Sequence, residues 1–187
     1  MIVLLTTLGV FVIWPDANET LAFDRTLIEH SQWWRVITGH FVHLSVTHWL
    51  GNTLGVLILW RLFATYPPFP YPLLALLFCT AITGIGLYRL APDLSLYVGF
   101  SGVLHGLLLL ALLSLALKER HYYIIVLILM TKVGWELSPF YDPYALQGTI
   151  GGRVEVRAHA LGLIAGSGFY ALMTMFQRIT LLKRTAL

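Results

Sequence analysis

The chain has 187 residues, of which 58% are hydrophobic and 11% are charged, whereas an average soluble domain has roughly 25% charged residues. A soluble fold of this size cannot cover so much apolar surface, and the mean hydropathy of +0.77 agrees. The net charge of +3 is too small and too scattered for a nucleic-acid interface, and a single cysteine excludes a disulfide-stapled fold. The composition therefore predicts an all-α integral membrane protein that lies in a lipid bilayer and binds no nucleic acid.

Six apolar segments alternate with polar, proline-rich or glycine-rich breaks. They cover residues 1–14, 42–64, 71–90, 98–117, 122–138 and 157–177. Each predicts a transmembrane helix, although the first would cover only about 21 Å of a hydrocarbon core roughly 30 Å thick. We therefore expect residues 1–187 to form a single domain, a bundle of six transmembrane helices.

Basic residues predict the orientation of this bundle. Six Lys and Arg residues fall on each side of the bundle, but those at Arg61, in the loop 118–121 and in the C-terminal tail lie within a shorter total length than those on the opposite side, which includes the long loops 15–41 and 138–156. Short cytoplasmic loops carry an excess of Lys and Arg. Both termini are therefore expected on the cytoplasmic side and the two long loops on the opposite side.

The second segment contains three polar residues where lipid-facing residues would be apolar. His48 and Asn52 are four residues apart and share a helix face, whereas His43 points about 140° away or precedes the helix. Polar groups inside apolar spans are costly and are therefore candidates for a functional role. The alternative is that they only hydrogen-bond between helices, which is common in membrane bundles.

The fourth segment begins with Gly99-Phe100-Ser101-Gly102 and has His105 one turn after the serine. Glycines on both sides of Ser101 allow a sharp backbone turn, which would expose the hydroxyl to a cavity. Alternatively, the serine bonds back to its own helix within a small-residue seam. His105 lies on the same helix face as Ser101 and is either a base or a buried polar neighbour.

The sixth segment contains His159, followed by Gly162 and Gly166. Two glycines at this spacing let another glycine-rich helix pack at close backbone distance, and the helix with Gly102 and Gly106 is a suitable partner. This contact would bring His159 toward Ser101 as a base toward its nucleophile. A histidine near the end of a span also occurs as a purely structural group.

In this order, the motifs resemble those of the rhomboid family of intramembrane serine proteases: W-R, H-x-x-x-x-H-x-x-x-N, G-x-S-G and A-H-x-x-G-x-x-x-G. The chain supplies Trp34-Arg35, His43/His48/Asn52, Gly99/Ser101/Gly102 and Ala158/His159/Gly162/Gly166. Within the family, the run Gly-Phe-Ser-Gly-Val-Leu-His-Gly is similar to the rhombosortase branch. His105 stands where rhomboids usually have a tyrosine.

The resemblance implies that Ser101 is the nucleophile and His159 the general base. The sixth segment has no Asp or Glu beside His159, so we expect a dyad in which packing and His105 orient the imidazole. The resemblance also implies that His48 and Asn52 stabilise the oxyanion.

The remaining motif residues are expected to support the site. The resemblance implies a structural role for His43 and for Gly99 and Gly102, which flank the serine. The pair Trp34-Arg35 would anchor the first outer loop at the interface, where aromatic residues gather. Lys132 and Glu136, four residues apart in the fifth segment, are expected to form an ion pair without a catalytic role.

The branch resemblance implies a substrate: a transmembrane or C-terminal tail segment of an exported protein, with a Gly-Gly sorting motif, cut in the inner membrane of a bacterium. No cofactor or metal is expected, and the sequence leaves the oligomeric state open. One alternative is an inactive rhomboid-like protein that binds transmembrane segments. A second, a metal path through the histidines, is disfavoured because the segments with His48, His105 and His159 contain no Cys, Asp or Glu.

Overall fold

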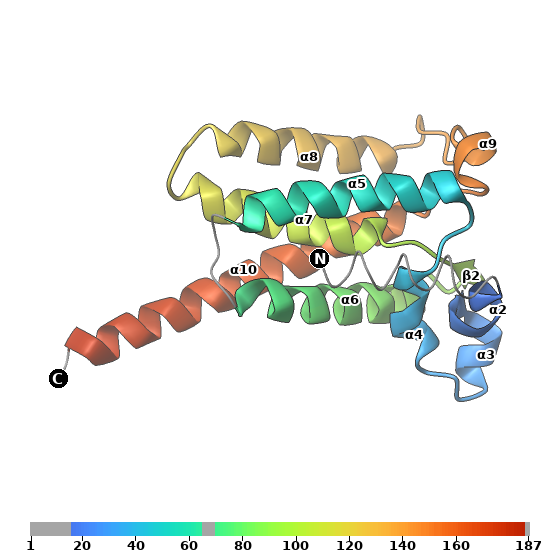
Figure 1. The fold of residues 1–187 in the computed structure, drawn as a ribbon, viewed down its shortest axis with the longest axis horizontal. Coiled ribbons are helices and arrows are strands. Elements are labelled where there is room, and N and C mark those ends of the chain that lie inside the picture. Colours follow the sequence, from blue (N-terminus) through green and yellow to red (C-terminus); the bar gives the residue numbers. More distant parts are fainter. Residues whose placement is uncertain (1–15, 65–69, 186–187) are drawn as a thin grey trace.

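A computed structural model describes residues 16–64 and 70–185, which are mostly helical. Five long helices lie side by side (Figure 1). Their bounds are α5 Val46–Phe63, α6 Tyr71–Leu90, α7 Ser101–Ala116, α8 Tyr122–Glu136 and α10 Val156–Thr185. These helices fall on the last five predicted segments, and the first, residues 1–14, lies outside the described residues.

Not every one of these helices is long enough to cross a bilayer alone. Among the described residues, α6 and the part of α10 up to Thr180 are long and apolar enough. A third span results if α5 is joined to the segment Arg35–Phe41 across a bend of 91°. Helix α7 is apolar but has 16 residues, about 24 Å at 1.5 Å per residue. Length and composition thus support two or three spans.

The two long loops and the loop before α7 contain short elements that the sequence did not predict. They are α2 Ala17–Leu21, β1 Phe23–Asp24, α3 Arg25–Glu29, α4 Arg35–Thr38, η1 Gly39–Phe41, β2 Leu96–Tyr97 and α9 Gln147–Ile150. The strands pair antiparallel, with Phe23 opposite Tyr97 and Asp24 opposite Leu96. The fold is thus not purely helical, although the sheet has only two residues in each strand. All these elements gather at one end of the bundle (Figure 1).

Helix α7 occupies the centre of the bundle. It contacts α5, α6, α8 and α10, and most of its residues are buried. Its partners in the main core include Cys79 of α6 and Phe169 and Met173 of α10. A helix that is apolar all round, as this one is, requires such an environment.

The closest packing is between α7 and α10, where glycines face each other. A β-carbon added to Gly162 would collide with the carbonyl oxygen of Gly102, and one added to Gly166 would collide with that of Gly106. The predicted glycine seam between these two helices is therefore confirmed.

Two arginines fasten the first loop to the bundle. The Arg25 guanidinium donates to the carbonyl oxygens of Leu94 (2.9 Å) and Ala91 (2.8 Å), and also to two others at the end of α6. Arg35, which is buried, donates to the carbonyls of Ala22 (2.9 Å) and Glu19 (2.7 Å). Both side chains thus join carbonyl groups of separate segments through hydrogen bonds.

We predict that Gly162→Ala destabilises the protein by about 1–3 kcal/mol, because the new methyl group overpacks the α7–α10 seam. Gly134→Ala is the matched control, since a β-carbon there meets nothing within 4 Å. Thermal unfolding in detergent measures both variants. An equal midpoint for Gly162→Ala and the wild type would contradict the importance of the seam.

Candidate active site

Ser101 and His159 meet at the end of the bundle where the short elements gather. Ser101 is the first residue of α7, and His159 lies in the first turn of α10. The serine Oγ is 3.0 Å from Nε2 of the imidazole. At this distance the hydroxyl can donate its proton to the ring, which is the geometry of a nucleophile and its base.

Local backbone features place the serine at this contact. Gly99 has φ +116°, a conformation that L side chains rarely adopt. Its amide donates to the carbonyl of Gly39 (3.0 Å), which ties the approach to α7 to the first loop. Gly102 packs so closely on Ala158 that an added β-carbon would lie 2.8 Å from the Ala158 carbonyl oxygen. These two glycines therefore fix the turn before Ser101 and bring α7 against the start of α10.

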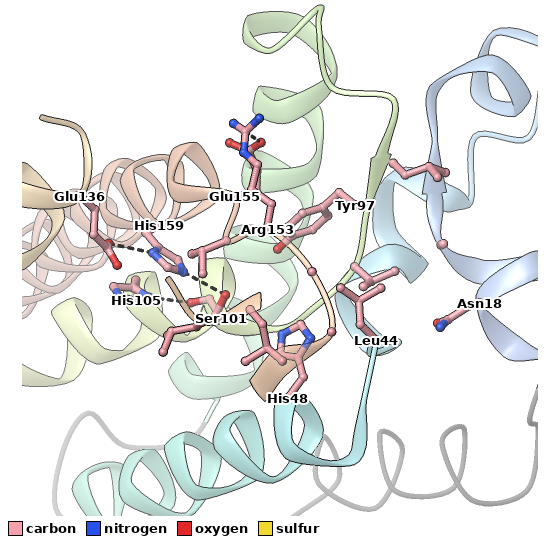
Figure 2. Close-up of a pocket in the computed structure, with 18 of the residues that line it drawn as sticks. Asn18, Leu44, His48, Tyr97, Ser101, His105, Glu136, Arg153, Glu155 and His159 are labelled. Carbon is pink, nitrogen blue, oxygen red and sulfur yellow. Dashed lines mark hydrogen bonds and ion pairs between the residues drawn. The ribbon is translucent and has the colours of Figure 1, made fainter. Parts of the chain in front are cut away.

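The second nitrogen of His159 also has a partner, which the sequence analysis did not predict. Nδ1 lies 2.9 Å from Oε2 of Glu136 at the end of α8, and both side chains are buried (Figure 2). The sequence analysis expected a dyad with no acidic residue beside His159. This expectation is wrong, because Glu136 lies against the imidazole. Glu136 is the only acidic residue inside the six predicted segments, and this was the signal that could have identified it.

Lys132 and His105 complete the surroundings of this contact. Nζ of Lys132 lies 2.8 Å from Oε1 of Glu136, which confirms the predicted ion pair. It is also 2.8 Å from Nε2 of His105. The His105 ring stacks on that of His159, with centroids 4.1 Å apart and planes 18° from parallel. His105 thus packs directly against the His159 imidazole.

His105, Glu136 and His159 also form a possible metal site. One donor atom from each lies within 4.8 Å of the others. However, the Lys132 ammonium lies 2.8 Å from two of these side chains. A metal ion would have to displace this ammonium, because two cations cannot share one carboxylate so closely without repulsion.

His48 and Asn52 lie on the other side of Ser101, on α5. A β-carbon added to Gly99 would be 2.7 Å from Nε2 of His48 and 3.8 Å from Nδ2 of Asn52, so both side chains border the turn before the serine. Asn52 is 7% exposed, and its Nδ2 has no hydrogen-bond partner among the described residues. Figure 2 shows His48 and His159 on opposite sides of Ser101. An unused donor beside a nucleophile is suited to binding a developing oxyanion.

Two other motif elements lie outside the reacting centre. His43 precedes α5, which begins at Val46, and its ring meets that of His48 edge-on with centroids 5.0 Å apart. Trp34 is about half exposed and donates through Nε1 to the carbonyl of Thr20 (3.3 Å). With Arg35, described above, these residues contact the first loop and α5, as a structural role requires.

An open cavity of about 790 Å³ gives access to the serine. Ser101, His48 and His159 line it together with apolar side chains from several loops: Leu44, Leu96, Val98, Leu146 and Ile150. Residues at the start of α5 hold the loop with α9, because Ser45 Oγ donates to the carbonyl of Ile150 (3.0 Å) and Thr47 donates to that of Thr149. These loop contributions were not predicted, because hydropathy does not indicate which loops meet.

An ion-pair cluster fixes the start of α10. The Arg157 guanidinium donates to both carboxylate oxygens of Glu155 (2.7 and 2.8 Å) and to Asp93 (2.5 Å). The hydrogen bond from Arg157 lowers the pKa of the exposed Asp93 carboxyl. The cluster ties the first turn of α10 to the loop after α6, two residues before His159.

A serine hydroxyl hydrogen-bonded to a buried imidazole, inside a bundle of apolar helices, is an arrangement found in serine hydrolases. The model of the rhomboid domain family matches residues 30–176, and the chain belongs to the rhomboid family. Rhomboids are generally intramembrane serine proteases, so the chain is an integral membrane protein with a domain that supports this activity. No curated protein matches the sequence significantly.

Proposed function

We propose that the chain is an active intramembrane serine endopeptidase with Ser101 as the nucleophile and His159 as the general base. The observation that carries the proposal is the 3.0 Å contact between Ser101 Oγ and His159 Nε2 at an open cavity. The match to the rhomboid domain over residues 30–176 supports the same reaction class. The two proposed residues come from α7 and α10, which the glycine seam holds together.

The reaction would proceed in two halves. The Ser101 oxygen attacks the scissile carbonyl carbon while its proton passes to Nε2 of His159, and the protonated imidazole then gives this proton to the departing amine. In the second half, water gives a proton to the same nitrogen and attacks the acyl carbon. The new carboxylic acid leaves, and the proton returns to the serine oxygen.

Oxyanion stabilisation would come from both sides of the serine. The first amides of a helix have no acceptor within that helix, so the Ser101 N–H is available to the carbonyl oxygen under attack. The side chains of His48 and Asn52 would donate from α5. Such preorganised donors are typically worth about 2.7 to 4 kcal/mol each in the transition state.

The proposed substrate is a transmembrane or C-terminal tail segment of an exported protein, as in the rhombosortase branch. The apolar walls of the cavity, which include Leu44, Leu146 and Ile150, suit an apolar segment. A Gly-Gly motif would help, because glycine destabilises a helix by about 1 kcal/mol relative to alanine and so exposes the peptide bond.

We also propose that residues 1–187 form one six-span domain in the inner membrane of a bacterium, with both termini in the cytoplasm. The density of basic residues in the short loops and tail supports this orientation. It puts the end of the bundle that holds Ser101 near the outer face, where exported tails are accessible.

The alternative, an inactive homologue that binds transmembrane segments, keeps the fold but needs no reactive serine. The bond between Ser101 and His159 favours the enzyme, as does the Nδ2 of Asn52, which has no hydrogen-bond partner within residues 16–64 and 70–185. A fluorophosphonate probe, which reacts with activated serines, discriminates between the two.

We expect the wild type in detergent to react with a fluorophosphonate probe and to cleave a tail-bearing reporter. Ser101→Ala and His159→Ala should abolish both signals while the protein still inserts and accumulates, because each removes one half of the proton transfer. Ser114→Ala, which changes a buried serine of α7 one helix length away from the cavity end, is the control. Turnover above a trace in either site variant would show that the pair is misassigned.

Asn52→Ala should reduce the cleavage rate by about 10² to 10³, because it removes a single oxyanion donor. The expected loss is in kcat, since the donor acts on the charge that develops during attack. Steady-state kinetics on the same reporter measure it. A change of less than about threefold would assign Asn52 a structural role.

Topology is tested with reporter fusions after residues 66, 146 and 187. The first and last should score cytoplasmic and the middle one outside, because the short loop 118–121 and the C-terminal tail, expected on the same side as residue 66, are rich in basic residues. If the C-terminal fusion scored outside, Ser101 would lie at the cytoplasmic end of its helix, and exported tails would not reach it.

A further inference from the structure

We propose that Glu136 and Lys132 of α8 are positioning residues for His159, so that the site operates as a Ser101–His159–Glu136 relay whose carboxylate is held by Lys132. The inference rests on the proposed protease function and assigns a role to two residues that the motif pattern leaves out. The three contacts that carry it are Ser101 to His159 (3.0 Å), His159 to Glu136 (2.9 Å) and Glu136 to Lys132 (2.8 Å).

The contacts determine which nitrogen of His159 carries the proton. A carboxylate only accepts hydrogen bonds, so Nδ1 of the imidazole must donate to Oε2 of Glu136. Nε2 of the neutral ring then has a free electron pair directed at the hydroxyl of Ser101. This is the tautomer that a general base for Ser101 requires.

The tautomer of His105 follows from its own partners. Its Nδ1 lies 2.7 Å from the carbonyl oxygen of Ser101 and must donate to it, so Nε2 accepts from the Lys132 ammonium at 2.8 Å. His105 therefore does not compete for the serine proton. Its ring stacks on that of His159 and limits the tilt of the base.

The buried Glu136 carboxylate depends on its contacts with Lys132 and His159. The Glu136 side chain is 6% exposed, whereas that of Lys132 is 43% exposed at the cavity. A carboxylate buried without partners would be strongly destabilising, and here the ammonium on one oxygen and the imidazole on the other compensate it. Lys132 thus keeps the acceptor charged and in place, while its own charge remains partly hydrated.

Packing of α8 aims Glu136 at the site. Leu129, Val133 and Glu136 follow the helical spacing of one face, and all three are buried. The two apolar residues pack against Leu109 and Leu112 of α7 and Leu163 of α10. The carboxylate therefore reaches His159 from a third helix, as the orienting group of a triad does.

The test compares Glu136→Gln with the wild type, with Glu119→Gln as the matched control because Glu119 is exposed and pairs only with His121 among the described residues. We expect kcat on the tail reporter to fall by about 10² to 10⁴ with KM nearly unchanged, because the glutamine amide does not select the required tautomer. Fluorophosphonate labelling of Ser101 should slow in parallel. The control should match the wild type.

Chemical rescue separates positioning from folding. Glu136→Ala leaves space for a small carboxylate, so added formate should restore turnover at least tenfold in this variant. It should restore none in Ser101→Ala. Because Lys132 acts through Glu136, the single variant Lys132→Met should turn over more slowly than the wild type. Adding Lys132→Met to Glu136→Gln should cause no further loss of activity.

The outcomes distinguish the relay from the protease function. If wild type cleaves and labels but Glu136→Gln stays within about threefold of its kcat, the relay is overturned and the protease stands. Loss of activity with a chelator and recovery with Zn²⁺ would instead assign His105, Glu136 and His159 to a metal site. If the wild type neither labels nor cleaves, both proposals fail.

Discussion

The close packing of α7 on α10 is the constraint on which the rest of the structure depends. Side chains normally separate two helices by several ångströms, but here glycines face each other and the backbones nearly touch. Ser101 and His159 both lie at the same end of this seam, so their hydrogen bond is set by backbone packing and not by flexible side chains. The proposed nucleophile and base are therefore preorganised, as proton transfer requires.

Three other helices, α5, α6 and α8, pack around α7 and α10, and each has a different role. Helix α5 presents donors that face the serine, and α8 presents an anion and a cation that face the imidazole. Helix α6 contributes no group to the cavity, but it carries the first loop through the carbonyls that Arg25 binds. The polar residues of α5, α8 and α10 that border Ser101 therefore come together only when these helices assemble.

Much of this arrangement was predictable from the sequence, and the missing part has a physical reason. Hydropathy located the five long helices, and the glycine spacing predicted the seam that joins Ser101 to His159. Glu136 was missed because its spacing to Lys132 already explains it as an ion pair within one helix. A pattern along one segment does not reveal contacts with another, and for the same reason the short strands and the cavity walls were not expected.

Leu146 and Ile150, in the loop with α9, line the cavity and form its roof. The hydrogen bonds from Ser45 and Thr47 link this roof to the start of α5. His48 lies in the same turn and donates its backbone amide to the Ser45 hydroxyl (3.1 Å). The roof and the proposed oxyanion donor are therefore connected through hydrogen bonds at the start of α5. If the roof shifts with these bonds intact, His48 shifts with it, and the space above the serine and the strength of transition-state binding change together.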